Sequence, residues 1–394
     1  MPYMTEKVFD RDNYAFEFEA TVLSVSNEGI ELNITAFFPG GGGQVCDTGT
    51  IRGLSVIDVF YEGDKIIHRV PNNDLKVGEK VWCSVDWDKR YDLMTGHTGE
   101  HLLFCSLKKY VPDLKISKIF ISPESKYVVV DQDVSWEDIN KAVNFANKAI
   151  RDNLPVTKSI MSRNDPELDN VRIKMDRISD DEEISVVSIG DIDLSACSGI
   201  HVMETGELEM LFVDRKVSAG KDGIAIHFKV GNQAKDSAMS LANICLRAAE
   251  ASDSKPDDLI RAVSNLKDEL NTTRRSVSNH AKRYAEDLTP KVVGGVDIYS
   301  GIFPQTERTV LSEIAESYKS EGAVSILISE GSTVSVIMSS GVPSIDCSAT
   351  LSKVLKSLGG KGGGKKDFAQ GGVTDPTSAK NVLDMLLDEI VRQL

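Results

Sequence analysis

The sequence predicts an α+β protein built from four consecutive parts. Three observations lead to this prediction: alternating polar and apolar residues before residue 96, mixed strand and helix patterns from 96 to 232, and a long helical pattern followed by a further α/β part. A chain of 394 residues also exceeds the usual size of one domain. We therefore expect parts at residues 1–95, 96–232, 233–290 and 291–394.

Residues 1–95 are expected to form a small antiparallel β-barrel. Residues 16–22, 29–34 and 81–87 each alternate with a period of two, which is typical of half-buried strands. Short strands separated by turn residues favour a barrel over an open sheet.

Residues 96–232 change to helical periodicity and then mix both patterns. We expect helices at 96–112 and 136–154, and strands at 186–189 and 224–228. This part is therefore predicted to be an α+β domain.

Residues 233–290 are predicted to be helical, with an interruption near Pro256. Apolar residues at near-heptad spacing follow this proline, so the segment is expected to be a helical hairpin or a coiled-coil-like arm. In the last part we expect a hairpin at 323–338, a helix at 349–357, a loop rich in glycine and lysine at 359–366, and a closing helix at 377–393.

Composition limits the class of protein. No apolar run approaches the ~20 residues needed to cross a bilayer, and the amino terminus lacks the basic and apolar parts of a signal peptide. The six cysteines are scattered, which fits a reducing compartment. We therefore expect a cytoplasmic protein without a membrane partner.

The charge is unevenly distributed. The net charge of −15 argues against nucleic-acid binding by the whole surface, but residues 233–394 carry 19 Lys and Arg against 21 Asp and Glu. Local basic clusters in this part could form one tRNA-binding face. Solvated lysine patches on an acidic protein explain the charge equally well.

Two short motifs about a hundred residues apart contain candidate metal ligands. His97 and His101 form H-x-x-x-H, and Cys197 and His201 form C-x-x-x-H. Two histidines one helical turn apart point the same way, and together the four side chains suit a tetrahedral Zn²⁺ ion. Taken alone, each motif is more often a chance pair, and four protein ligands are also typical of a closed structural site.

The first motif also has a rival interpretation. With Glu100 it reads H-x-x-E-H, the signature of inverted zinc peptidases, in which Glu100 is the general base and Cys197 and His201 are incidental. A solvated helix position for Glu100 is the interpretation that we favour.

Together these motifs resemble the editing domain of alanyl-tRNA synthetase and its freestanding relatives, the AlaX trans-editing proteins. Four segments in family order carry the resemblance across residues 37–372: the glycine motif at 38–49, the H-x-x-x-H motif with Leu102 and Leu103, the C-x-G-x-H-V motif at 197–202, and the glycine-rich segment at 359–372, which is similar to that of a DHHA1 domain. The long AlaX form describes the chain best. Ser198 and Ile200 stand where glycine and threonine are usual, which bears on the shape of the pocket and the preferred amino acid.

The resemblance implies a barrel at 1–95, a zinc-binding editing domain at 96–232, a helical linker at 233–290 and a DHHA1-like α/β domain for tRNA binding or oligomerisation at 291–394. It implies zinc-dependent hydrolysis of the ester of alanine tRNA mischarged with serine, and more weakly with glycine. A homodimer through the helical arm or the last domain is a further expectation. The implied site residues are His97, His101, Cys197 and His201 for Zn²⁺; Gln44, His97 and His101 for catalysis; Gly41, Gly42, Gly43, Gln44, Asp47 and Thr48 for the substrate; and Lys361, Lys365 and Lys366 for tRNA phosphates.

Several of these residues also have a purely structural interpretation. The glycine run is also a plain tight turn, Asp47 and Thr48 also cap a turn, and the lysine segment is also a structural loop. We expect no aminoacylation domain before the barrel, and the sequence contains no Asp-His-His triplet. We therefore expect removal of amino acids from tRNA and no phosphoesterase activity. An inverted zinc peptidase, or a non-catalytic tRNA-binding protein with structural zinc, are the alternative functions.

Overall fold

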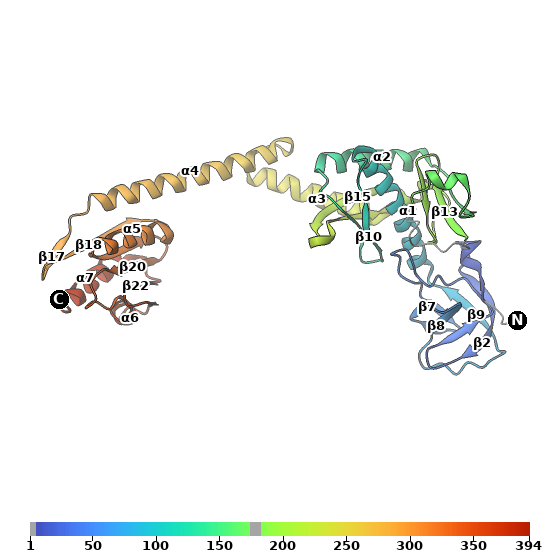
Figure 1. Cartoon of the computed structure of the whole chain (residues 1–394), viewed down its shortest axis with the longest axis horizontal. Helices are drawn as coiled ribbons and strands as arrows, with labels where there is room; N and C mark the ends of the chain where they lie inside the picture. Colours follow the sequence, from blue (N-terminus) through green and yellow to red (C-terminus); the bar gives the residue numbers. More distant parts are fainter. Residues whose placement is uncertain (1–4, 174–182) are drawn as a thin grey trace. The chain divides into compact units, whose positions relative to one another are not determined.

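The computed structural model describes residues 5–173 and 183–394, and the chain divides into two units (Figure 1). The first unit covers Met1–Arg247 and the second covers Ala248–Leu394. Each unit has its own hydrophobic core. Within the described ranges, every helix is too short or too polar to cross a membrane.

The first unit begins with a nearly closed, antiparallel sheet of seven strands. Their order is β6-β5-β9-β2-β3-β8-β7, and the two edge strands are joined through Ile57 alone. A single residue therefore connects the two edges, and the nearly closed sheet agrees in part with the predicted small barrel. The strands are β2 (Glu17–Val25), β3 (Ile30–Leu32), β5 (Gly49–Ile51), β6 (Leu54–Val56), β7 (Asp58–Glu62), β8 (Lys65–Arg69) and β9 (Lys80–Val85), and a short parallel pair, β1 (Glu6–Lys7) with β4 (Ile34–Thr35), accompanies them.

The alternating residues of β9 show why one face of this sheet is buried. Val81, Cys83 and Val85 are buried, whereas Trp82 between them is 58% exposed. A period of two places one face of the strand in the core and the other in solvent.

Helix α1 (Trp87–Tyr110) follows β9 directly, and it begins earlier than the predicted start at residue 96. Asp86 caps it, because its side chain accepts a hydrogen bond from the Lys89 N–H. The strand predicted to reach residue 87 therefore ends at Val85, and Trp87 belongs to the helix. Other elements pack closely on α1, and at Gly99 a Cβ would lie 2.7 Å from Val230.

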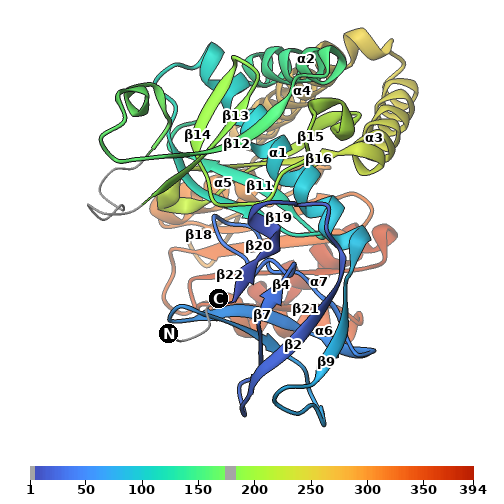
Figure 2. The same cartoon turned by 90° about the vertical axis from the view of Figure 1, so that its right-hand side faces the viewer.

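Two antiparallel sheets and helix α2 (Trp136–Asp152) complete the fold around α1. Figure 2 gives a second view of this region. Strand β14 contacts α1. One sheet has the order β10-β11-β16-β15 and the other β12-β13-β14. The strands are β10 (Ile116–Ile121), β11 (Lys126–Val130), β15 (Leu211–Ser218), β16 (Ile224–Val230), β12 (Val156–Met161), β13 (Ile184–Ile189) and β14 (Asp193–Ala196). The predicted helix at 136–154 and strands at 186–189 and 224–228 are confirmed.

Helices α3 (Gly231–Ala251) and α4 (Leu259–Glu286) follow, with a single 3₁₀ turn (Pro256–Asp258) between them. Both predicted helical stretches and the break at Pro256 are therefore present. The pairing of the two helices as an arm stays a prediction, and so does the four-part division of the chain.

The second unit contains a six-stranded sheet with helices on both faces. Its order is β17-β18-β19-β20-β22-β21, and only β18 and β19 are parallel. Ile326 and Ile328 pack against α6 and α7, whereas Leu327 packs against α5 and the end of α4. The elements are β17 (Lys291–Val293), β18 (Val296–Pro304), α5 (Arg308–Ser320), β19 (Val324–Glu330), β20 (Val334–Ser340), α6 (Cys347–Ser357), β21 (Lys361–Gly364), β22 (Phe368–Val373) and α7 (Ala379–Val391).

The loop predicted at residues 359–366 is wrong in part, because Lys361–Gly364 forms the edge strand β21. Glycine is uncommon in strands, but here it permits a close approach of α6 to the strand. A Cβ at Gly362 would lie 2.8 Å from the side chain of Leu355 in α6. The glycines therefore let α6 pack directly on the sheet, and Lys365 and Lys366 lie in the turn to β22.

Candidate metal centre

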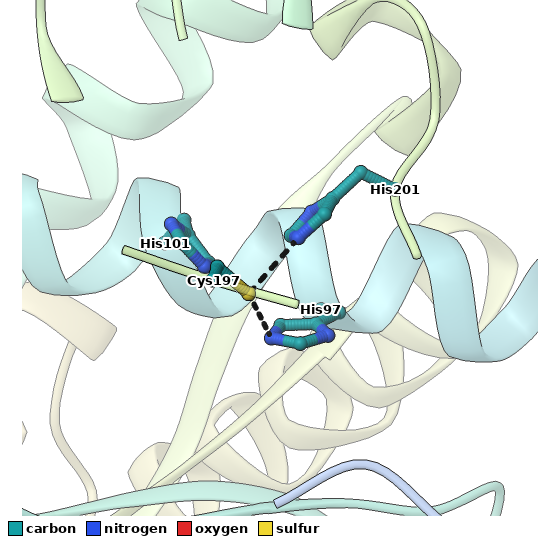
Figure 3. A group of neighbouring side chains, drawn as sticks. All are labelled: His97, His101, Cys197 and His201. Atoms are coloured by element: carbon teal, nitrogen blue, oxygen red, sulfur yellow. Dashed lines mark hydrogen bonds between the residues drawn. The ribbon is translucent and has the colours of Figure 1, made fainter. Parts of the chain in front are cut away.

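Four side chains with metal-ligand chemistry converge in the first unit (Figure 3). They are His97 and His101 of α1 with Cys197 and His201, and one ligand atom from each lies within 4.8 Å of the others. Cys197 Sγ is 3.5 Å from His97 Nε2 and 3.4 Å from His201 Nε2. The structure therefore brings together the two motifs that are distant in the sequence.

The spacing of these atoms suits a tetrahedral ion. Zinc lies ~2.0–2.1 Å from a histidine nitrogen and ~2.3 Å from a thiolate sulfur. With tetrahedral angles, a nitrogen and a sulfur bound to the same ion are then ~3.6 Å apart. Both Sγ–Nε2 distances lie within about 0.2 Å of that value, so the group fits a zinc ion.

Local structure explains the convergence. One helical turn of α1 separates His97 from His101, and Cys197 directly follows β14, which neighbours α1. Gly199 allows the next residues to pass close to the first histidine. A Cβ at Gly199 would lie 3.3 Å from His97 Nε2 and inside 3.0 Å of two other ring atoms.

A polar side chain holds the second ring nitrogen of each histidine. Because every Nδ1 has a partner, the Nε2 atoms are left to face the common centre, as in established metal sites. The pairs are His97 Nδ1 with Gln44 Oε1 at 2.7 Å, His101 Nδ1 with Asp193 Oδ2 at 2.9 Å, and His201 Nδ1 with Thr98 Oγ1 at 3.1 Å.

Electrostatics in the centre favours ligand forms of two residues. Burial raises the pKa of the Cys197 thiol, but His97 and His101 lower it more, so the pKa falls well below its ordinary value and the metal-binding thiolate is favoured. Burial and the charge of His97 lower the pKa of His201 to about 3, which keeps that ring neutral. Burial also lowers the pKa of His101, but hydrogen bonds with Asp193 and Cys197 raise it to about 10. Metal binding would therefore displace a proton from His101.

Glu100 is a fully buried carboxylate, so the favoured interpretation of a solvated helix position is wrong. Its Oε2 is 3.8 Å from His101 Nε2, and neither carboxylate oxygen has a hydrogen-bond partner in the described part of the chain. A buried carboxylate without partners is costly unless a cation lies nearby. A metal ion in the adjacent centre would supply that positive charge.

The glycine segment lies against β10. The Ile121 N–H donates a hydrogen bond to the Gly43 carbonyl at 2.8 Å. Gly43 has φ +91°, and a Cβ there would meet the Ile119 carbonyl oxygen, so this position requires glycine. The segment is therefore a structural turn that also places its neighbours beside the metal centre.

Donor groups of this segment remain free for a ligand. The Gly41 N–H donates to the Gln44 carbonyl, whereas the N–H groups of Gly42 and Gly43 have no acceptor among the described residues. The side chain of Gln44 is 4% exposed, and its Nε2 likewise lacks a partner in the described ranges. A built Cβ at Gly42 would lie 3.8 Å from His97 Cε1, so these donors border the centre.

Asp47 and Thr48, two further residues proposed to bind the substrate, have surroundings that differ from those of the glycines and Gln44. Asp47 is fully buried, and it accepts hydrogen bonds from the guanidinium of Arg90 and from the Phe38 N–H. These contacts occupy its carboxylate, so a structural role fits it better than substrate contact. Thr48 lines a different hollow together with Asp86, beside the start of α1.

Lys361, Lys365 and Lys366 lie on the second unit, at the edge strand β21 and the turn that follows it. All three are exposed. This exposure would allow the three lysines to contact a nucleic acid.

Sequence reasoning missed the residues that orient the histidines, namely Asp193 and Thr98. Asp193 begins β14 four residues before Cys197, and Thr98 follows His97. Neither spacing has a known motif, because these contacts join segments about a hundred residues apart. Their proximity to known ligand motifs was the only available signal.

Comparisons with known proteins agree with this arrangement. Residues 295–392 match the DHHA1 domain family, and residues 184–221 match the "Threonyl and Alanyl tRNA synthetase second additional domain". The second match includes Asp193, Cys197 and His201.

Whole-length relatives fall into two groups. The alanyl-tRNA editing protein AlaX-L of Pyrococcus horikoshii is 28% identical over 408 residues, which cover 98% of each protein. The alanine–tRNA ligase of Methanoregula boonei is 27% identical over 403 residues, covering 99% of this chain. The chain spans only 44% of the length of that ligase. Among solved structures, the C-Ala domain of Aquifex aeolicus alanyl-tRNA synthetase is 24% identical with a TM-score of 0.25, and it covers 26% of this chain and 99% of that domain.

Proposed function

This chain belongs to the long form of the AlaX-type trans-editing proteins, homologous to the editing and DHHA1 domains of alanyl-tRNA synthetase, and from this premise we propose that it hydrolyses mischarged alanine tRNA. The scissile bond is the ester between the amino acid and the terminal ribose of tRNA(Ala). Serine is the expected amino acid, and glycine a weaker substrate. The observation that carries the proposal is a zinc-compatible group of three histidines and a cysteine beside free N–H donors.

Zn²⁺ is the proposed cofactor, held by His97, His101, Cys197 and His201. A bound zinc ion supplies Lewis acidity and a fixed point for the amino group of the substrate or for water. The surrounding residues do the remaining work. Gln44 holds His97 in position through Nδ1, and its own buried amide nitrogen has no partner among the described residues.

The glycine segment would stabilise the charge that develops during ester hydrolysis. The N–H groups of Gly42 and Gly43 have the chemistry of an oxyanion hole, in which fixed donors stabilise negative charge. Gly41 would contribute through the turn that fixes these donors. Asp47 supports the same segment from the core through Arg90, and Thr48 stays a weaker candidate for substrate contact.

Selectivity for serine has a physical basis. A pocket that hydrogen-bonds the serine hydroxyl leaves polar groups unpaired when alanine binds, and this is penalised. The correct alanyl ester is then spared. Glycine lacks the hydroxyl, so we expect slower hydrolysis of its ester.

The second unit is proposed to contact tRNA through Lys361, Lys365 and Lys366. Exposed lysines bind phosphates mainly through charge, and this binding weakens with salt. A homodimer through α4 or the second unit is a further proposal, because α4 exposes apolar residues at heptad spacing. A tRNA substrate would place the protein in the cytoplasm.

The inverted zinc peptidase is the main rival. That reading makes Cys197 and His201 incidental, yet both lie with the two histidines of α1. This observation favours the deacylase. A non-catalytic tRNA-binding protein with structural zinc is distinguished only by an activity measurement.

The decisive experiment compares serine-charged and alanine-charged tRNA(Ala) as substrates of the purified protein. Rapid loss of the serine ester alone supports the proposal, and equal inertness towards both would refute it. Cys197→Ala should abolish zinc binding and hydrolysis, whereas Cys245→Ala, a half-buried cysteine of α3, should retain both. A peptidase would survive Cys197→Ala, and the non-catalytic alternative would bind zinc and tRNA without releasing serine.

A further inference from the structure

A large cleft opens beside the candidate metal centre. It encloses about 920 Å³, and Gly42, Gly43 and Ser198 are among its lining residues. Gly42 borders the ring of His97, and Ser198 directly follows Cys197. One end of the cleft is therefore formed by the residues that surround the metal centre.

The cleft is basic although the chain around it is acidic. Residues 1–232 carry 26 Lys and Arg against 39 Asp and Glu. By contrast, the described residues that line the cleft include Lys108, Lys115, Lys118 and Arg172, and none of them is acidic. Positive charge is thus concentrated in a cleft that adjoins the metal centre.

The three lysines are available to a ligand. Lys108, Lys115 and Lys118 are exposed, and among the described residues no carboxylate lies within 4.0 Å of their amino groups. By comparison, many other lysines of this unit are paired, such as Lys65 with Glu31. Unpaired lysines gathered in one cleft create a local positive potential that attracts polyanions.

Arg172 differs from the lysines because it is anchored. Its Nη2 is 3.4 Å from Asp193 Oδ2, and its guanidinium lies over the ring of Phe104 with 5.0 Å to the ring centroid. Its Nε is buried and has no partner in the described ranges. The guanidinium of Arg172 is therefore fixed at the point where the cleft approaches His101. Its Nη2 is 3.4 Å from His101 Nδ1.

We propose that this cleft binds the single-stranded 3′ end of tRNA, with Lys108, Lys115 and Lys118 on its phosphates and Arg172 beside the terminal nucleotide. The inference rests on the proposed function and names how the substrate reaches the site. The ester sits on the last ribose, so the strand that leads to it must lie on the surface next to the metal centre. Each nucleotide brings one negative charge, which the acidic surface elsewhere on this unit repels.

The apolar side chains of the cleft suit the same ligand. Leu114, Ile116 and Ile119 line it together with the lysines. Grooves for single-stranded nucleic acid combine positive charge along the backbone with apolar or aromatic contact to the bases. The cleft has both components, and the glycine segment forms its boundary at the metal centre.

The test is a Lys115→Ala/Lys118→Ala double variant, compared with Lys76→Ala/Lys221→Ala. The control removes two exposed lysines of the same unit that lie outside the cleft. The first readout is the affinity for uncharged tRNA(Ala), measured by fluorescence anisotropy from about 50 to 200 mM salt. Salt weakens the affinity of the wild type between about 50 and 200 mM. Because two single-strand phosphate contacts are lost, this fall in affinity should be about sevenfold smaller in the cleft variant. The control should keep the wild-type dependence.

Two further measurements locate the contact. A tRNA trimmed of its single-stranded 3′ end should bind the wild type and the cleft variant equally, because the lysines then have no phosphates to contact. With serine-charged tRNA, the cleft variant should show a raised KM and an unchanged kcat. An unchanged salt dependence, an equal loss in the control, or a difference that persists with trimmed tRNA would overturn the inference.

The binding measurements also separate this inference from the proposed function. A wild-type protein that does not hydrolyse the ester refutes the proposed deacylase. Binding of uncharged tRNA and its salt dependence still decide whether the cleft holds the 3′ end.

Discussion

Replacing Gly199 by alanine should displace the ring of His97 and weaken zinc binding. The added Cβ would lie 3.3 Å from Nε2 and well inside 3.0 Å of Cε1 and Nδ1. Carbon atoms in contact stay ~3.5–4.0 Å apart, so the ring has to move by on the order of 1 Å. That movement would disturb both the contact with Cys197 Sγ and the hydrogen bond to Gln44.

The size of the effect follows from what these contacts do. Losing an interaction that orients a metal ligand typically lowers metal affinity ~10–100-fold, and here the ligand itself moves. We therefore expect at least a tenfold weaker affinity (~1.4 kcal/mol). Zinc affinity is measured by competition with a chromogenic chelator, and zinc content by elemental analysis.

Two control variants test the reasoning. Ser198→Ala changes the exposed neighbouring residue, and Gly363→Ala adds a Cβ where no atom lies within 4 Å. Both should bind zinc as the wild type does, and Gly199→Ala should keep its thermal unfolding transition. Wild-type zinc affinity in Gly199→Ala would show that His97 is not a ligand or that the centre does not have this geometry.

Three further perturbations follow from the structure. Asp47→Asn leaves Arg90 buried without its counter-charge, and it should lower the free energy of unfolding by ~3–5 kcal/mol in denaturant titrations; lost activity at unchanged stability would instead indicate a substrate contact. Burial lowers the pKa of His68 from the ordinary 6.5 to about 4. Between these pH values the unfolded chain binds a proton at His68 and the folded protein does not, so roughly 3 kcal/mol of stability is lost as the pH falls from 6.5 to 4. His68→Gln should flatten that part of the stability profile, and equal pH slopes would contradict this account. Leu266→Lys with Leu270→Lys, at half-exposed positions on α4, should shift a dimer towards monomer in sedimentation experiments, and an unchanged mass would exclude the arm as the interface.

Local patterns in the sequence predicted the candidate ligands well. An i,i+4 pair on a helix and a short C-x-x-x-H segment can be recognised in the sequence, because the residues of each motif are close together in the chain. The partners of the histidines are not readable in this way. Asp193 and Thr98 acquire their roles only when β14 and α1 pack side by side.

Two errors have a common physical origin in packing. Glu100 was expected in solvent because helices usually keep one polar face, but other elements enclose α1 on nearly all sides. The segment at 361–364 was expected to be a loop because glycine has little strand propensity, but α6 lies so close to Gly362 that a larger residue would not fit there. Propensity describes a residue alone, whereas both outcomes depend on a neighbour far along the chain.

The hydrogen bonds between the glycine segment and β10 have a consequence for how the protein loses activity on heating. Gln44 reaches His97 only while the Ile121 N–H holds the Gly43 carbonyl and the barrel stays docked. Partial melting of the barrel would remove Gln44 even if the helix with both histidines remained folded. Heat inactivation should therefore coincide with deuterium uptake at Ile121, ahead of exchange in α1.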